Sequence, residues 1–60
     1  MQDYIFHVHD DRYAVPTLEF VAAKDDFRAR ELAEQRLRAS QHHLAIEVFE
    51  DDALLFRVAR

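Results

Sequence analysis

The amino-acid sequence predicts an α+β fold in which one helix covers one face of a four-stranded β-sheet. Only residues 25–40 are long enough, and free enough of helix breakers, to form a helix of several turns. Two short segments rich in β-branched and aromatic residues precede this helix, and two more follow it. The chain has 60 residues and no internal repeat. We therefore expect a single domain, residues 1–60, with the element order β-β-α-β-β.

The first predicted strand comprises residues 4–9, in which side chains of two kinds alternate. Tyr4, Phe6 and Val8 share one face, which we assign to the core. The opposite face carries a more polar set: Ile5, His7 and His9. The chain contains no glycine, so we expect the turn that follows to use aspartate, a residue that tolerates the backbone conformations of turns.

The second predicted strand comprises residues 15–22. We assign the apolar set to the face that the helix covers: Leu18, Phe20 and Ala22. The opposite face then carries Thr17, Glu19 and Val21. Pro16 has no N–H to give to a ladder, which places this strand at an edge of the sheet and the first strand inside it.

The helix begins with Asp25 or Asp26 as its N-cap, a position at which a side-chain oxygen accepts from a backbone N–H. A narrow stripe of small and aliphatic residues predicts the buried side of the helix: Ala29, Leu32, Ala33, Leu37 and Ser40. Small residues at its centre allow a close approach to the sheet. Phe27 projects away from the stripe, and either packs beneath the first turn of the helix or makes an exposed contact.

The last two predicted strands, residues 44–49 and 54–58, form a hairpin. Each carries one apolar set on a single face, Leu44, Ile46 and Val48 on the first and Leu54, Phe56 and Val58 on the second. A two-residue loop would place these sets on opposite faces, because a one-residue slip reverses a strand. We therefore predict a three-residue loop, residues 50–52, with Val48 opposite Leu54 and Asp52 in the left-handed conformation.

Two strand orders fit a sheet with the second strand at its edge. The order 2-1-3-4 is antiparallel throughout, and the order 2-1-4-3 has a parallel centre. We favour 2-1-3-4, because its helical connection skips one strand and not two. In either order the helix leaves one face open, and the apolar residues on that face are candidates for a protein interface: Ile5, Val21, Phe49 and Leu55.

Composition disfavours several classes of partner. The chain carries 12 acidic and 8 basic residues, a net charge of −4, which repels phosphate and argues against nucleic-acid binding. No apolar run approaches the roughly 20 residues of a membrane span. The first residues are acidic and unlike a signal peptide, so we expect a cytoplasmic protein. The chain has no cysteine, so disulfides and thiolate zinc sites are excluded.

Four histidines are the only chemically suggestive residues. His7 and His9 point to the same side of a strand, and His42 and His43 follow the helix. In the order 2-1-3-4, His9 and Asp10 would lie near the second pair, which allows a zinc or nickel site. The simpler interpretation is that these are polar surface and loop residues. We name the four as weak metal candidates and predict no cofactor.

Catalytic patterns are missing. Ser40 is the only serine, and no base or oxyanion turn accompanies it. The paired aspartates fall at predicted turns and at the helix cap, where backbone geometry favours this residue. Without glycine there is no phosphate-binding loop of the usual kind. We therefore predict a protein that is not an enzyme.

Three stretches carry a resemblance to known proteins: the opening YIFHVHDD, the helix with Ala29 and Ala33, and the closing AIEVFEDDALLFRV. Together they resemble a group of short, uncharacterised bacterial proteins. Those proteins begin with a Tyr-x-Phe-His/Asp-Val-x-Asp strand and end with an Ile-Glu-Val-x-Asp-Glu hairpin. This sequence departs from the pattern, which usually has glycine in both turns. The resemblance implies a β-β-α-β-β fold and a bacterial source, and it implies no site residues.

The sequence thus leads us to expect a small protein-interaction module that works as a homodimer, or binds another protein, through the open face or an edge strand. The alternative is a metal- or ligand-binding protein that uses the histidines.

Overall fold

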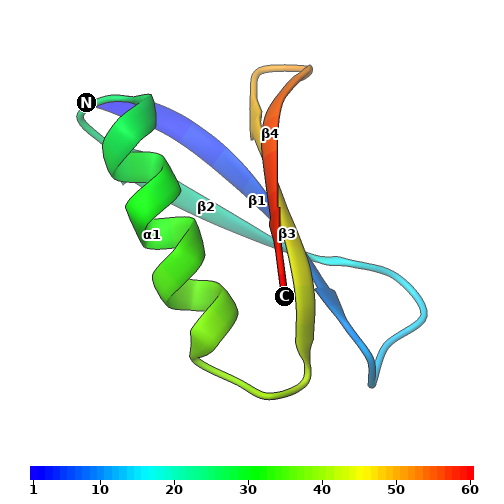
Figure 1. Ribbon diagram of the computed structural model, residues 1–60. Coiled ribbons are helices and arrows are strands. Elements are labelled where there is room, and N and C mark those ends of the chain that lie inside the picture. The colour runs from blue at the N-terminus through cyan, green and yellow to red at the C-terminus, as the bar shows by residue number, and fades with distance from the viewer.

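The computed structural model describes all 60 residues as two hairpins joined by one helix. Its elements are β1 (Gln2–Asp10), β2 (Thr17–Ala23), α1 (Asp26–Arg38), β3 (His43–Glu50) and β4 (Ala53–Ala59) (Figure 1). This confirms the predicted β-β-α-β-β order.

The sheet has the strand order β2-β1-β3-β4, and every neighbouring pair is antiparallel. The favoured prediction, 2-1-3-4, is therefore confirmed. The helix lies on one face of the sheet and joins β2 to β3 across β1 (Figure 1). β2 and β4 form the two edges, so each presents unpaired backbone groups along its outer side.

Helix α1 is fixed at both ends. Asp25 is its N-cap, and the side chain accepts a hydrogen bond of 2.8 Å from the backbone N–H of Arg28. At the other end the guanidinium of Arg60 donates to the carbonyl of Leu37, in the last turn of the helix, and to the carbonyl of Ser40, just beyond it. Arg60 thereby joins the end of β4 to the end of the helix.

The core lies between α1 and one face of the two central strands. Ala29 and Ala33 are fully buried, as the small-residue stripe predicted, and Tyr4 contacts the start of the helix. The Tyr4 hydroxyl donates to Asp26 at 2.7 Å. Burial, together with this carboxylate, raises the pKa of Tyr4 above its ordinary value. The remaining large core side chains come from β1, β3 and β4: Phe6, Val8, Ile46, Val48 and Val58.

The predicted faces of β2 are wrong. Tyr4 pairs with Val21 and Phe6 with Glu19, so Val21 and Glu19 stand on the helix side of the sheet. Phe20 pairs with Ile5 and therefore stands on the opposite face, where it is 79% exposed. The narrow helix stripe does not extend over the edge strand, so the larger apolar set of β2 gains no cover from the helix.

Leu44 also departs from its predicted core position. The β1–β3 pairing shifts between two neighbours, with His9 opposite Ala45 and Asp10 opposite His43. Leu44 is the extra residue of this β-bulge and is 50% exposed. His43 takes the helix-side position instead and is buried.

The second hairpin has a two-residue loop and not the predicted three. Glu50 pairs with Ala53, and Asp51, not Asp52, has the positive φ of 55°. Val48 pairs with Phe56, and the register then shifts so that Phe49 opposes Leu54. Ile46, Val48, Phe56 and Val58 stay on the helix side because a β-bulge, with Leu55 as the extra residue, restores the alternation that a two-residue loop alone would reverse. The predicted helix-side position of Leu54 is wrong, because its pairing with Phe49 places it on the opposite face.

Candidate interaction surface

The sheet face opposite α1, called here the uncovered face, carries an apolar row that crosses all four strands. The pairing places Phe20 beside Ile5, Ile5 beside Phe49, and Phe49 beside Leu54. Phe20 and Leu54 are exposed, and Ile5 and Phe49 are half-buried by their neighbours. We call these four residues the apolar row.

A more polar row runs parallel to it, one step along the strands. Leu18 pairs with His7, His7 with Glu47, and Glu47 with Arg57. The His7 ring stacks on Phe49 with ring centroids 4.2 Å apart, which joins the two rows. Glu47 also lies 2.8 Å from the Nε2 atom of His9. The uncovered face therefore has an apolar band with charged groups along one border.

The structure places the four predicted interface residues in different positions. Ile5 and Phe49 belong to the apolar row, and Leu55 is the partly exposed bulge residue beside it. The prediction for Val21 is wrong, because this residue lies on the helix side of the sheet. The sequence reasoning missed three exposed residues: Leu18, Phe20 and Leu54.

A signal for the correct β2 faces was present in the helix. Arg36 falls at the margin of the helix stripe, where its aliphatic stem can lie on the sheet, so an acidic residue on the helix side of the sheet can pair with its guanidinium. Glu19 is the only acidic residue of β2. Placing Glu19 on the helix side would have assigned Val21 to the same side and Phe20 to the uncovered face.

The histidines divide into two pairs. The side chains of His7 and His9 lie on the uncovered face. His43 is buried on the helix side, where its Nδ1 atom lies 2.7 Å from the Arg36 carbonyl and its Nε2 atom 3.8 Å from Asp10. His42 lies 3.0 Å from Asp11. No three His, Asp or Glu side chains stand in an arrangement that could hold a metal ion.

The carboxylate of Asp10 is fully occupied by one neighbour. It accepts hydrogen bonds from the backbone N–H, the Nε and the Nη2 atoms of Arg12 at 2.8, 2.9 and 2.6 Å. These bonds outweigh the effect of burial and hold the pKa of Asp10 well below its usual range. No buried side-chain nitrogen or oxygen in the protein lacks a partner. The polar cluster at this end of β1 is thus explained by folding alone.

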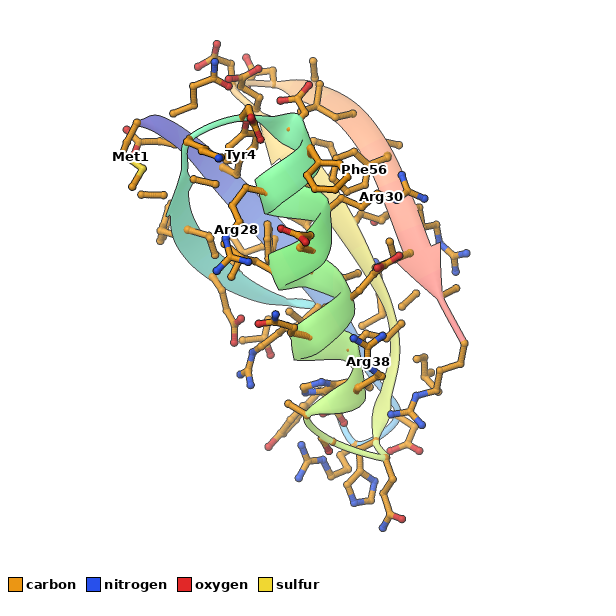
Figure 2. All side chains as sticks on the ribbon, turned by 60° about the vertical axis from the view of Figure 1, so that its left-hand side comes forward. Met1, Tyr4, Arg28, Arg30, Arg38 and Phe56 are labelled. Atoms are coloured by element: carbon orange, nitrogen blue, oxygen red, sulfur yellow. The ribbon has the colours of Figure 1, made fainter.

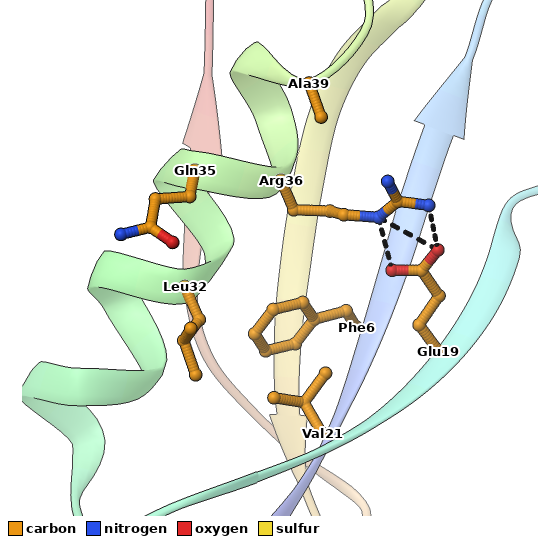
Figure 3. Close-up of a pocket in the computed structure, with 7 residues that line it drawn as sticks. All are labelled: Phe6, Glu19, Val21, Leu32, Gln35, Arg36 and Ala39. Atoms are coloured by element: carbon orange, nitrogen blue, oxygen red, sulfur yellow. Dashed lines mark hydrogen bonds and ion pairs between the residues drawn. The ribbon is translucent and has the colours of Figure 1, made fainter.

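The seam between α1 and the edge strand β2 is underfilled. A hollow of about 320 Å³ lies there (Figure 3), with Val21 and Glu19 from the strand and Leu32 and Arg36 from the helix on its walls. The full lining is Phe6, Glu19, Val21, Leu32, Gln35, Arg36 and Ala39. Figure 3 shows the Arg36 guanidinium reaching across to the Glu19 carboxylate.

A second hollow, of about 620 Å³, continues the seam towards the start of the helix and shares Leu32 with the first. Its walls are Met1, Ala22, Ala23, Lys24, Phe27, Arg28, Glu31 and Leu32. Phe27 is 71% exposed here, so the exposed interpretation of this residue is correct and the buried one is wrong. We call the two hollows together the α1–β2 groove.

The opposite flank of the helix is closed. Arg30 lies over the ring of Phe56 from β4, with its guanidinium carbon 5.1 Å from the ring centroid (Figure 2). This cation–π contact fills the seam between α1 and the other edge strand. The helix therefore seals one edge of the sheet and leaves the other edge hollow.

Comparison with known proteins identifies no relative. No protein-family model, curated protein or solved structure matches this chain. No helix in the protein has the length and apolar character needed to cross a membrane.

Proposed function

We propose that this protein is a non-enzymatic interaction module that forms a homodimer through the uncovered face. The observation that carries the proposal is the apolar row, which crosses the whole sheet and includes a phenylalanine, Phe20, that is 79% exposed. A contiguous apolar surface of this kind on a small protein marks an interaction site. The sequence resemblance favours a bacterial source, and we propose a cytoplasmic setting.

The size of the face suits a modest dimer. The two longer principal extents, 31 and 21 Å, give a flat footprint of about 650 Å², their product, against roughly 800 Å² per partner in a standard interface. A dimer at the low end of interface sizes should dissociate on dilution. We therefore expect a concentration-dependent equilibrium and not a permanent complex.

The layout of the two rows favours a second copy as the occupant. Consider a two-fold axis that lies in the interface between the two copies, parallel to the strands and over the midline between β1 and β3. It sets Ile5 against Phe49 of the other copy, and His7 against Glu47 of the other copy. Apolar residues then meet apolar ones, and an imidazole meets a carboxylate. Packing two sheets face to face would leave both helices on the outside.

The alternative built on the histidines has less support. It requires ligands from the uncovered face and from the helix side, where His43 is already bonded to the helix backbone. An edge strand remains the second route to association, and β4 is an edge as the sequence predicted.

The test is the molecular mass in solution, measured by sedimentation equilibrium from low micromolar to low millimolar concentration. We expect a monomer–dimer equilibrium for the native chain and a monomer for Phe20→Glu. Phe27→Glu is the matched control, because it places the same charge at an equally exposed phenylalanine on the helix side. A native protein that is monomeric throughout, or a control that dissociates as readily as Phe20→Glu, would refute the proposal.

A further inference from the structure

The two edges of the sheet differ in a way that points to a second binding surface. At the β4 edge, Arg30 and Phe56 close the space beneath the helix. At the β2 edge, the α1–β2 groove stays open beside a strand that pairs only with β1. We propose that the groove binds an extended segment of another protein, which pairs with β2 as a fifth strand. This surface is separate from the uncovered face.

The backbone of β2 is suited to accept such a strand. Its outer side has no neighbour, and half of its N–H and C=O groups point that way. Pro16, the only proline, lies just before the strand, so every residue of Thr17–Ala23 keeps its N–H. Strand addition of this kind takes affinity from main-chain hydrogen bonds and specificity from pockets for alternate side chains.

The groove provides two such hollows, one after the other along β2. The first lies beside Glu19 and Val21, and the second beside Ala23 and Lys24, and both include Leu32 of the helix. Alternate side chains of a strand point to the same face of the sheet. A strand paired with β2 would therefore turn every second side chain towards the helix side, where the two hollows lie. Their walls are largely apolar, so we expect aliphatic residues at two alternate positions.

Charge selects the partner and its direction. The second hollow is bordered by Lys24 and Arg28, and Arg28 is paired with Glu31. Lys24 makes no ion pair, and it lies directly after the end of β2. The rest of the sheet is antiparallel, and an antiparallel strand would have its N-terminal end near Lys24. The expected segment is therefore extended, with an acidic residue followed by two alternating aliphatic residues.

The experiment uses a synthetic, end-blocked peptide of the sequence Asp-Thr-Leu-Thr-Val-Thr and the isotope-labelled full chain. We expect amide shifts in NMR spectra concentrated on β2, and methyl shifts at Val21 and Leu32. A peptide with the aspartate moved to its C-terminal end should bind more weakly by up to about fivefold, the upper limit for one exposed ion pair. A peptide with alternate N-methylated residues keeps its side chains and loses ladder donors, so it should not bind.

Two protein variants make the assignment specific. Lys24→Glu should reverse the preference for the aspartate position, whereas Arg38→Glu, the same charge change at another exposed site on α1, should not. The proposal is overturned if the shifts fall on β4 or the uncovered face. Equal binding of the N-methylated peptide, or no binding at millimolar concentration, overturns it as well. Each result is independent of whether the protein dimerises, because Leu54→Glu, a change in the apolar row on the opposite edge strand β4, can serve as a monomeric background.

Discussion

Glu19 of β2 and Arg36 of α1 form a two-pronged ion pair that ties the edge strand to the helix. The Nε atom of Arg36 lies 2.8 Å from Oε1 of Glu19, and Nη2 lies 2.5 Å from Oε2. The pair spans the hollow seam and takes the place of apolar packing there (Figure 3). The hydrogen bonds from Arg36 lower the pKa of Glu19.

Glu19→Gln should destabilise the protein by about 0.5–1 kcal/mol, a value kept small because both groups face solvent. Because the folded-state pKa of Glu19 is lowered, the stabilisation is present above the ordinary glutamate pKa of about 4.3 and is lost as pH falls below it. Urea unfolding at neutral pH and at pH near 3 measures the difference. Arg38→Gln is the control, since Arg38 makes no ion pair, and an equal loss from both variants would contradict this assignment.

Asp10→Asn should lower stability at neutral pH, because the amide cannot accept all of the hydrogen bonds that Arg12 gives to the carboxylate. The folded-state pKa of Asp10 is lowered, so its contribution is full above the ordinary aspartate pKa of about 3.9 and fades as pH falls below that value. Thermal unfolding of both proteins across this range should therefore show melting temperatures that converge in acid. A gap that stays constant with pH would mean that the carboxylate charge plays no part.

Ala33→Leu should destabilise the protein by about 1–3 kcal/mol, because Ala33 is fully buried where the helix meets the sheet and a larger side chain forces the two apart. Arg38→Leu is the matched control at an exposed position of the same helix and should be nearly neutral. Chemical denaturation gives both values. If Ala33→Leu were neutral, the close approach of helix and sheet would not be a requirement of this fold.

Asp51→Gly should stabilise the second hairpin by about 0.5 kcal/mol. The residue has a φ of 55°, and glycine removes the steric cost of that conformation, although it adds freedom to the unfolded chain. Asp52→Gly should give no gain, since only the second effect applies to it. Thermal melts of the two variants separate these outcomes, and a greater gain at Asp52 would place the left-handed residue there.

The features that sequence predicted well depend on strong local signals. One uninterrupted segment formed the helix, with Asp25 as its cap. Pro16 placed the second strand at the edge, and the preference for the shorter helical connection then selected the correct one of two strand orders. Ile5 and Phe49 were assigned correctly to the uncovered face because they alternate with core residues on the two central strands. In these two strands buried and exposed residues alternate, because the helix covers only one face of the sheet.

The features that failed depend on how strands align with each other. Alternation in β2 fits either face equally well, and only its register with β1 shows that Phe20 is uncovered and Val21 is not. Bulges at Leu44 and Leu55 interrupt the period of two, so counting residues from a turn gives the wrong partner. The histidines separate for the same reason, since the bulge at Leu44 places His43 on the helix side, whereas His7 and His9 lie on the uncovered face.

The two bulges flanking β3 also bear on which insertions and deletions the chain can accept. Leu44 and Leu55 are the residues without a cross-strand partner, so removing either one would leave all the remaining pairs and faces in place. Removing Ile46 or Phe56 would instead turn the neighbouring side chains to the wrong side. The hairpins are thus tolerant of a changed chain length at these two points, and relatives of this protein that differ from it by one residue should have gained or lost it there.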